Sequence, residues 1–473
     1  MCGAGVTYSP PMRIARRHAG IRALRVAAGL AVAALLVVGC STTRPPVGAD
    51  GKVDNGASLP APGVTASDIS IGYQVGDISA LRKRIGFKGV DYGSYDTLVK
   101  GLDAVVAYVN ANGGLGGRTL KPVLSSQGSA YSDDALFKQF TQDSPVFAAV
   151  LTGAFQNSTR PCYQAARTIM LDLTAIAHDQ GEFDQFAPYL WAPDAPELGA
   201  FVRAQVQSLA TRGWFGTKGV AIVAPDAVVS RRVVNDVVVP ELTKVGVTRT
   251  TQAFIDASNI GTLGQSTANA LTSARSQGVD RIFVVGGARI LGIMISDVAA
   301  SGLHVNYAMS TFDLPSFVVD NPTFIVDGVT QGMAGLGYAP GEDQRLSTDV
   351  FPDPSRGNEV LCKRIVDDAG ANPPQPYREN YQAVFGYCDA TLMLKAALDK
   401  VPRGTVTPNA FRDAVWTLGE SVQNALPAHT LWRAGRFAGA SVARPLAYQP
   451  ACVLPDRPEL GCFRYDGAPV PLT

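Results

Sequence analysis

The chain has 473 residues, of which 46% are hydrophobic and 17% charged, and its formal net charge is +1. This composition is typical of a folded globular protein and excludes a largely disordered chain, and the length favours two domains over one. A net charge near zero gives no basic field, so we expect no nucleic-acid partner. The histidines are scattered and form no ligand motif with the cysteines, so we expect no metal and no cofactor.

Residues 1–39 have the segment order of a bacterial lipoprotein signal peptide. Arginines between positions 13 and 25 precede an apolar run at 26–38, which is too short to span about 30 Å of hydrocarbon as a helix. The run ends in Val37-Val38-Gly39-Cys40, which resembles a lipobox. We therefore expect Cys40 to be lipidated and to anchor the protein on the extracytoplasmic face of a bacterial cell membrane. A generic cleavage site with an incidental cysteine is the alternative, and Met12 is an alternative start.

Residues 40–67 are rich in Ser, Thr, Pro and Gly and lack an apolar period, which predicts a flexible tether. The chain then begins to alternate between apolar strands and helices. A strand is predicted at 69–73, and the next helix carries Leu98, Leu102, Val105 and Val109 on one face.

The stretch that follows this helix carries the most specific motif in the chain. The run Val109-Asn-Ala-Asn-Gly-Gly-Leu-Gly-Gly-Arg-Thr-Leu leads from the helix through a glycine turn into an apolar strand. A dinucleotide-binding loop needs the opposite order, strand before helix, so we disfavour a phosphate site here. The run resembles the N-x-x-GG-x-x-G-x-x-L signature of type I periplasmic binding proteins of the branched-chain amino-acid (Leu/Ile/Val) kind, which are substrate-binding proteins of ABC transporters.

The alternation continues in two similar units. Strands are predicted at 146–151 and 169–173, and after a break rich in Pro and aromatics the pattern restarts at 220–223 and runs to 305–309. The resemblance implies an α/β fold with two doubly wound parallel-sheet lobes joined by a three-stranded hinge. By that analogy, residues 68–186 and 330–425 form the first lobe, and 187–329 and 426–473 form the second lobe, with a cysteine-containing tail.

Export to an oxidising compartment makes disulfides feasible. We expect Cys452 to pair with Cys462 across a Pro-rich loop and Cys362 to pair with Cys388 between neighbouring helices, which leaves Cys162 as a buried free thiol.

In the first lobe, polar residues follow two of the predicted strands, and two tyrosines precede the motif helix. Helix N-terminal amides together with such side chains form a receptor for a carboxylate or another anion. Helix capping by Ser158 and a plain turn role for Thr174 are equally compatible with the sequence. We expect ligand contacts from Tyr92, Tyr95, Gln156, Asn157, Ser158 and Thr174.

In the second lobe, we expect the loops that carry Asp226, Arg289, Thr311 and Asp313 to face the ligand. Amino-acid-binding relatives place an acidic residue and tyrosines on such loops to hold the ammonium group. Here Arg289 stands where a tyrosine is common and Thr311 lies near the acidic position, so Asp226 or Asp313 would have to substitute. Arg289 either favours an anionic ligand or is a solvated arginine at a helix start.

The resemblance implies an extracytoplasmic solute-binding lipoprotein without enzymatic activity. As a monomer, it would capture a small organic solute, an amino acid or a related carboxylate or amide, and deliver it to the permease subunits of an ABC importer. A sensory or scaffold lipoprotein that uses the same fold to signal to a membrane or cell-envelope partner is the alternative. A hydrolase with Cys162 or Ser158 as nucleophile is a weaker hypothesis, because neither has a histidine nearby in the sequence.

Overall fold

A computed structural model describes residues 55–472 apart from 78, 81–88, 126–131, 154–158, 175, 257–259, 288–289, 302–304, 322–329, 331, 348, 405 and 457–460. The predicted signal peptide, Cys40 and most of the predicted tether lie outside these residues. The compact unit that the structure describes begins at Gly56 and runs to the C-terminus.

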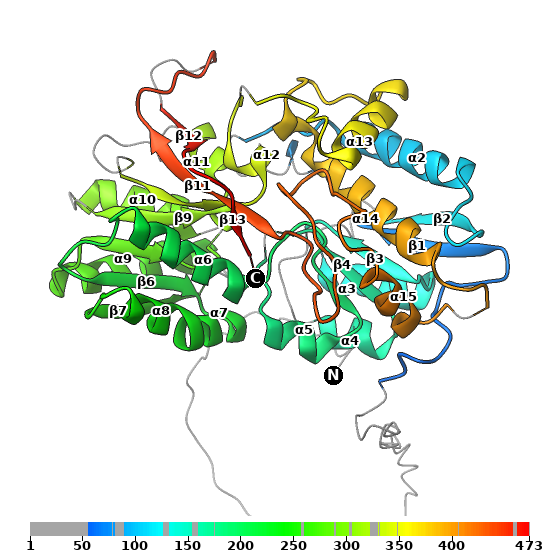
Figure 1. Cartoon of the computed structure of the whole chain (residues 1–473), viewed down its shortest axis with the longest axis horizontal. Coiled ribbons are helices and arrows are strands. Elements are labelled where there is room, and N and C mark those ends of the chain that lie inside the picture. The colour runs from blue at the N-terminus through cyan, green and yellow to red at the C-terminus, as the bar shows by residue number, and fades with distance from the viewer. Residues whose placement is uncertain are drawn as a thin grey trace, which may run out of the picture. The chain divides into compact units, whose positions relative to one another are not determined.

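The first sheet has five strands in the order β2-β1-β3-β4-β5, and all its pairings are parallel (Figure 1). Its strands are β1 (Asp68–Tyr73), β2 (Thr119–Leu124), β3 (Ala148–Leu151), β4 (Ile169–Asp172) and β5 (Leu190–Trp191). Every residue of β3 and β4 is buried, as expected for the centre of a parallel sheet that helices cover on both faces. The helices that accompany it are α2 (Tyr95–Ala111), α3 (Asp133–Lys138), α4 (Arg160–Ala165), α5 (Gln180–Phe186), α13 (Gly357–Asp368), α14 (Gln382–Leu398) and α15 (Pro408–Val415). We call these elements the first lobe.

Helix α2 and the turn after it match the predicted motif. Ser94 caps the helix by accepting a hydrogen bond from the Thr97 amide, and the predicted apolar face is buried against α13 and α14. The helix ends where Gly114 takes a positive φ of +67° and its amide donates to the Val109 carbonyl at 2.9 Å. A Cβ at Gly114 would lie 2.0 Å from the Arg118 carbonyl oxygen, so this turn requires glycine.

The second sheet has eight strands, seven of them in the order β12-β11-β10-β9-β8-β6-β7, with β13 paired to β11. Its strands are β6 (Val220–Pro225), β7 (Thr250–Ile255), β8 (Arg281–Val284), β9 (Asn306–Ser310), β10 (Ala334–Gly337), β11 (Val442–Gln449), β12 (Cys462–Tyr465) and β13 (Val470–Pro471). Its helices are α6 (Leu198–Thr211), α7 (Val228–Val233), α8 (Val239–Lys244), α9 (Ile260–Ser276), α10 (Ile290–Ser301) and α11 (Pro315–Asp320). We call these elements the second lobe; the short helix α12 (Pro340–Asp343) follows β10.

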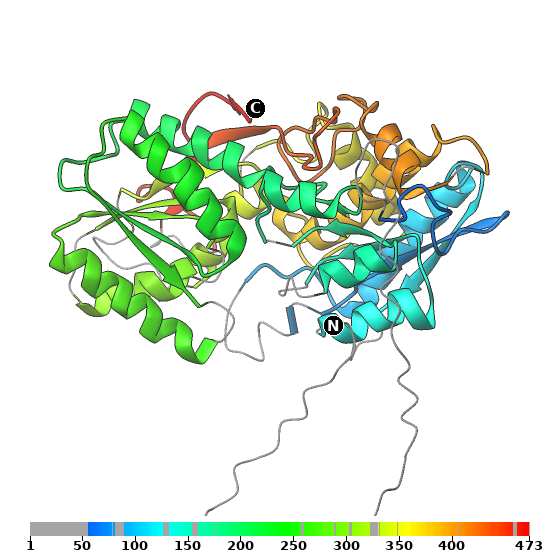
Figure 2. The ribbon, with the colours of Figure 1, turned by 90° about the horizontal axis from the view of Figure 1, so that it is seen from below.

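The strand β6 shows why the second sheet needs helices on both faces. Val220 and Ile222 belong to one buried apolar cluster, whereas Ala221 and Val223 belong to another. Because successive strand residues point to opposite faces, each face of β6 contacts a separate core. Figure 2 shows helices above and below this sheet. The predicted α/β fold with two sheets is confirmed, but the antiparallel pairings of β11 with β10, β12 and β13 were not predicted.

The chain crosses between the sheets three times, and the crossings are hydrogen-bonded to one another. After β5, the Ala192 amide donates to the Phe437 carbonyl at 2.9 Å and the Ala192 carbonyl accepts from the Gly439 amide at 2.9 Å. After β10, the Tyr338 carbonyl accepts from the Ala428 amide at 2.7 Å. The sequence suggested that the first lobe ends at residue 186 and that the second ends at residue 329. In the structure, the first sheet continues past 186 with β5, and the second sheet continues past 329 with β10.

Residues 57–67, expected to belong to the flexible tether, are instead packed on the first lobe. Ala57 and Ala61 are buried, the Ala61 amide donates to the Val406 carbonyl at 3.2 Å, and the Asn409 amide donates to the Ala57 carbonyl at 3.1 Å. The composition suggested a tether, but these two small apolar residues fit against the start of α15. The expectation is wrong for this part of the segment.

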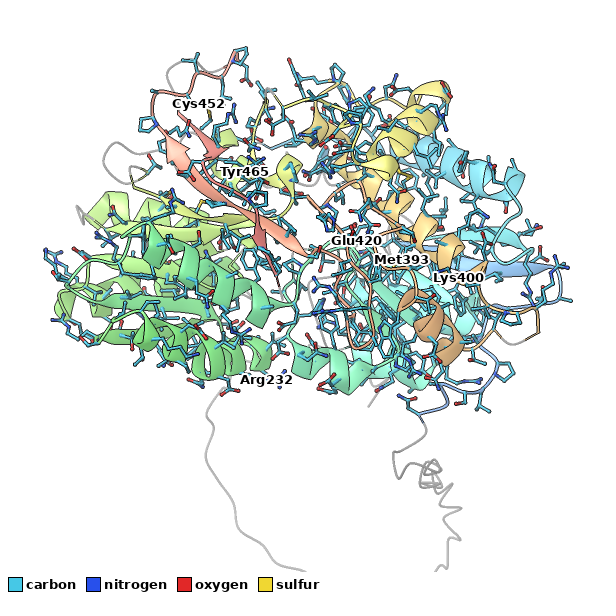
Figure 3. The ribbon with its side chains drawn as sticks, in the orientation of Figure 1. Arg232, Met393, Lys400, Glu420, Cys452 and Tyr465 are labelled. Atoms are coloured by element: carbon cyan, nitrogen blue, oxygen red, sulfur yellow. A yellow bond between two sulfur atoms is a disulfide. The ribbon has the colours of Figure 1, made fainter. Side chains whose placement is uncertain are left out.

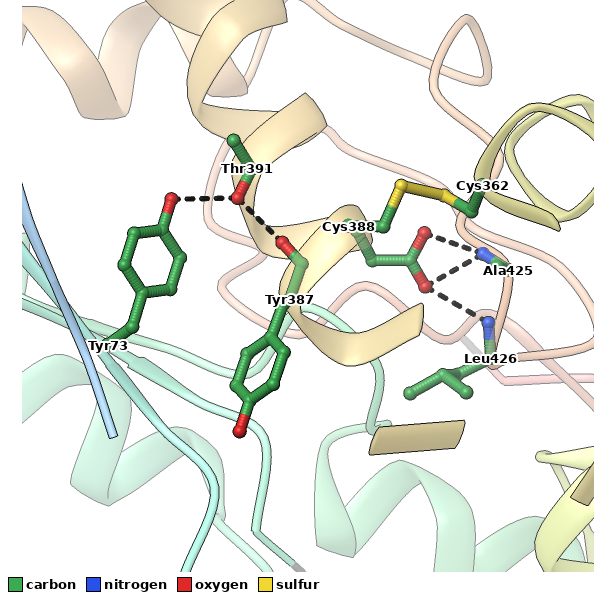
Figure 4. Close-up of a disulfide and its surroundings, with 8 residues drawn as sticks. Tyr73, Cys362, Tyr387, Cys388, Thr391, Ala425 and Leu426 are labelled. Atoms are coloured by element: carbon green, nitrogen blue, oxygen red, sulfur yellow. Dashed lines mark hydrogen bonds between the residues drawn. A yellow bond between two sulfur atoms is a disulfide. The ribbon is translucent and has the colours of Figure 1, made fainter. Parts of the chain in front are cut away.

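Disulfides join Cys362 to Cys388 and Cys452 to Cys462, the two pairs expected from the sequence. The first links α13 to α14 (Figure 4). Next to Cys388, the Asp389 carboxylate accepts hydrogen bonds from the amides of Ala425 (2.7 Å) and Leu426 (3.0 Å), which fixes the chain before its third crossing. Cys162 is disulfide-bonded, so the expectation of a free thiol is wrong. That expectation rested on elimination among the other cysteines and not on any property of Cys162.

Candidate functional site

The candidate site lies where the carboxyl ends of the two sets of parallel strands approach each other. Open α/β sheets bind ligands outside the carboxyl ends of their strands. The loop after β4 carries Ala177, and the loop after β8 carries Gly286. A Cβ at Gly286 would lie 3.5 Å from the Ala177 Cβ, so loops from the two lobes are in contact at this point.

Gln74, directly after β1, fixes the start of the loop that follows β3. Its Oε1 accepts hydrogen bonds from the amides of Thr152 and Gly153, both at 2.9 Å, and its carbonyl accepts from the Thr152 hydroxyl at 2.8 Å. The side chain is buried, which makes these bonds strong local constraints. Gln74 was not predicted as a site residue, although a polar residue directly after an apolar strand was a usable signal.

Four charged side chains are buried together behind the loop after β4. The Asp172 carboxylate accepts from Arg160 (3.1 Å) and from His178 Nε2 (3.1 Å). The Glu182 carboxylate accepts from Arg160 (2.5 Å) and from His178 Nδ1 (2.9 Å). Because both ring nitrogens face carboxylate oxygens, both must carry protons, and His178 is an imidazolium. The cluster therefore contains two positive and two negative charges.

The pKa values agree with this assignment. Burial and the charge of Arg160 would lower the pKa of His178, but the hydrogen bonds to Asp172 and Glu182 outweigh them and raise the pKa above its usual value. Burial alone would raise the pKa of the Asp172 carboxyl, whereas the hydrogen bond from His178 and the charges of His178 and Arg160 bring it well below its usual range. The cluster holds the ends of α4, β4 and α5 together. None of its four members was predicted as a site residue.

Thr174 is bonded to this cluster. Its hydroxyl donates to the Asp172 carboxylate at 2.6 Å, its amide donates to the same oxygen at 2.9 Å, and its hydroxyl oxygen accepts from the Ile176 amide at 3.2 Å. These bonds correspond to the turn role that the sequence left open. The expected ligand residues Gln156, Asn157 and Ser158 lie outside the described residues.

The two tyrosines lie before and at the start of α2. Tyr92 is 6% exposed and its amide donates to the Ser79 hydroxyl at 3.2 Å. Tyr95 is the first residue of α2 and is partly buried against the main apolar core. Both follow the connection from β1 and therefore lie on the carboxyl-end side of the first sheet.

In the second lobe, Asp226 is bound within its own lobe. Its carboxylate accepts from Arg231 Nε at 2.7 Å, and the Arg231 guanidinium stacks over the Phe254 ring at 4.1 Å. This hydrogen bond from Arg231 lowers the pKa of the Asp226 carboxyl below its usual value. Arg289 lies outside the described residues.

Thr311 and Asp313 are both buried. The Asp313 carboxylate accepts from the Ser310 amide (2.7 Å), the Ser310 hydroxyl (3.0 Å) and the Gly287 amide (3.2 Å), and burial raises its pKa to about 7. The Thr311 hydroxyl accepts from the Tyr338 amide at 2.8 Å, which ties the end of β9 to the second crossing. Thr311 and Asp313 thus lie together at the end of β9. Among the described residues, no contact links either of them to Thr174, Tyr92 or Tyr95.

A groove of about 240 Å³ lies at the edge of the site, between the starts of α5 and α6 and the end of α7. It is lined by Asp179, Gln180, Gly181, Glu197, Gly199, Arg203, Arg232, Val233, Asp236 and Val237. Among the described residues, no three His, Cys, Asp or Glu side chains gather where they would hold a metal ion. Within the same part of the chain, no helix combines the length and apolar character needed to cross a bilayer.

Comparison with known proteins rests on structure alone. No protein-family model matches the chain, and no curated protein sequence matches it. Among solved structures, a periplasmic binding protein type 1 from Bordetella pertussis matches with a TM-score of 0.55 at 14% identity, over 85% of this chain and 99% of the other. The chain has the type I periplasmic binding protein fold.

Two further structures with the type I fold were determined with ligands. An ABC transporter substrate-binding protein from Desulfitobacterium hafniense in complex with Leu matches with a TM-score of 0.51 at 16% identity, over 84% of this chain and 99% of the other. A solute-binding protein of an ABC transporter from R. palustris in complex with 4-hydroxybenzoate matches with a TM-score of 0.56 at 14% identity, over 85% and 96%. Both bound molecules carry a carboxylate, on otherwise different skeletons.

Proposed function

We propose that this protein is an extracytoplasmic solute-binding protein that captures a small organic carboxylate between its lobes and delivers it to an ABC importer. One observation carries the proposal. The loops at the carboxyl ends of the strands in one sheet face those of the other sheet, and three hydrogen-bonded crossings join the two sheets. Such an arrangement supports closure of two lobes around a ligand, which buries the ligand and changes the surface that a permease meets. Lipidation at Cys40, a monomeric state and attachment to the cell membrane are parts of the same proposal.

The carboxylate is the part of the ligand that the sequence and the comparisons both favour. The loop after β3 supplies hydroxyl and amide side chains at Gln156, Asn157 and Ser158, a suitable set for an anion. Leucine and 4-hydroxybenzoate, the ligands named for two structures with this fold, share only the carboxylate and a compact apolar body.

An ammonium group on the ligand is less well supported. Asp226 and Asp313 are the two residues that would take the role of the ammonium-binding acid. The first is paired with Arg231, and the second accepts three hydrogen bonds from its own lobe. We therefore propose that carboxylates without an ammonium group, such as aromatic acids, bind at least as well as amino acids.

A thermal-shift panel with matched neutral analogues tests the proposal. The protein from Ser41 onward contains every residue that the structure describes and lacks the predicted lipid. A carboxylate ligand present at a free concentration of 100 times its Kd stabilises the folded state by about 2.7 kcal/mol, which raises the unfolding temperature measurably. We expect 4-hydroxybenzoate or a related acid to raise this temperature, and 4-hydroxybenzamide to leave it unchanged. The proposal would be contradicted if, across a panel of aromatic, aliphatic and amino acids, no carboxylate raised the unfolding temperature more than its amide did.

A further inference from the structure

One short segment of the first lobe makes several hydrogen bonds to helices of the second. Residues 177–181, which we call the junction segment, comprise the end of the connection from β4 and the first two residues of α5. The His178 carbonyl accepts from the Leu198 amide at 2.8 Å, and the Gln180 amide donates to the Glu197 carboxylate at 3.1 Å. Both partners lie at the start of α6, directly after the first crossing, so these two bonds lie close to the point about which the lobes would pivot.

Asp179 makes a different kind of contact, with a helix that does not follow a crossing. Arg232, near the C-terminal end of α7, donates through Nη2 to Asp179 Oδ1 at 2.6 Å and through Nε to Asp179 Oδ2. Two parallel N–H···O bonds from one guanidinium to one carboxylate are the strongest geometry for such a pair. Figure 3 shows Arg232 at the boundary between α7 and α5.

The surroundings hold this pair in one geometry. Asp179 has a side chain that is 6% exposed and also caps α5 by accepting from the Glu182 amide at 2.9 Å. Gly181 makes room for the guanidinium, because a Cβ there would lie 2.8 Å from the Arg232 Cζ. The Arg232 side chain is 36% exposed and lines the 240 Å³ groove, so salt and water reach the pair from one side.

We propose that the Arg232–Asp179 pair is an interlobe latch that stabilises the closed arrangement of the lobes and thereby sets solute affinity. The inference rests on the proposed function for its link to affinity. Asp179 lies in the first lobe and Arg232 in the second, so a motion that moves α7 away from α5 breaks both hydrogen bonds at once. Among the described residues, neither Arg232 nor Asp179 is hydrogen-bonded to an expected ligand residue, so we expect the latch to change the affinity for every solute by the same factor.

The neighbouring arginine provides a matched control. Arg231 lies on the same helix and carries the same charge, but it pairs with Asp226 inside the second lobe at 2.7 Å. Its side chain is 49% exposed. Arg231→Ala therefore removes the same charge from α7 without removing a contact between lobes.

Small-angle scattering of the ligand-free protein at low salt tests the latch without any ligand. We expect Arg232→Ala to have a larger radius of gyration than wild type, and Arg231→Ala to match wild type. Raising the NaCl concentration is expected to expand wild type and to leave Arg232→Ala unchanged. Equal radii of gyration for wild type and Arg232→Ala, or equal expansion in both alanine variants, would overturn the proposal.

Titration with 4-hydroxybenzoate, or with another acid that passes the thermal-shift panel, provides the second readout. Because Arg231 holds the candidate ligand residue Asp226, the control for this titration is Lys244→Ala, which removes one positive charge that pairs with Glu241 inside the second lobe at 2.8 Å. We expect Arg232→Ala to raise the Kd about three- to tenfold and Lys244→Ala to change it less than about twofold. Arg232→Lys keeps the charge but loses the paired donors, so it should fall between wild type and Arg232→Ala; it also replaces the alanine variant if that variant does not fold. If no acid binds, the proposed function fails while the scattering comparison still tests the latch. An unchanged Kd in Arg232→Ala would overturn the link to affinity.

Discussion

Side chains that the sequence marked for ligand binding turn out to be bonded inside their own lobe. Thr174 donates to Asp172, and Asp313 accepts from Ser310 and Gly287. Their positions after strands were predictable, because strand ends follow from the apolar pattern. Their hydrogen-bond partners were not predictable, because Asp172 comes close to Thr174, and Gly287 to Asp313, only once the turns between the elements have formed. The same reason hid the buried cluster of Arg160, Asp172, His178 and Glu182, whose members come from three separate elements.

A buried carboxyl at the second crossing gives the fold a pH dependence. Burial raises the pKa of Asp343 from 3.8 to about 7, and its carboxylate accepts from the Tyr465 hydroxyl (2.6 Å) and the Ala339 amide (3.1 Å). The folded-state pKa of Asp343 lies above the unfolded value. Its contribution to the free energy of unfolding is therefore fully present below pH 3.8 and is lost as the pH rises to about 7. Asp313 and Asp389, each with a pKa raised to about 7, act with the same sign.

We therefore predict that Asp343→Asn reduces the loss of stability between pH 5 and pH 8. The amide stays neutral and keeps one oxygen for Tyr465 and Ala339, so the variant should recover roughly 2 kcal/mol of the difference in unfolding free energy between the two pH values. Urea unfolding at both pH values measures it. Asp413→Asn, at a side chain that is 61% exposed, is the control and should parallel wild type. An Asp343→Asn profile parallel to wild type would contradict the prediction.

Elements with strong local signals were predicted well. The apolar face of α2 and the glycine turn after it both match the structure, since capping and turn residues act within a few positions. The tail was predicted poorly. β11 pairs with β12 and also with β10, which lies more than 100 residues earlier in the chain, and no local pattern specifies the pairing with β10.

The glycine turn after α2 gives a test at the level of one element. Gly114→Ala should lower the free energy of unfolding by about 3 kcal/mol or more, because positive φ and a clash with the Arg118 carbonyl act together. Gly113→Ala is the matched control, since Gly113 has φ +92° but no atom within 4 Å of an added Cβ. It should cost only the backbone strain, about 1–2 kcal/mol. Equal losses in the two variants by denaturant unfolding would show that the turn is not packed as described.

At the scale of the whole molecule, two sheets share part of one apolar core and are linked through three crossings that bond to one another. The sequence predicted two lobes because its strand–helix alternation stops and restarts. It placed the first crossing a few residues early, because the short strand β5 has no distinctive pattern of its own. We propose that these lobes close around a carboxylate.

Small-angle scattering of wild-type protein with and without a bound acid tests that claim most directly. The measurement uses the acid that raises the unfolding temperature in the thermal-shift panel, at a saturating concentration, with its amide as the control. We predict that the acid lowers the radius of gyration and that the amide leaves it unchanged. Saturation by the acid with no change in the radius of gyration would contradict closure of the lobes around a carboxylate.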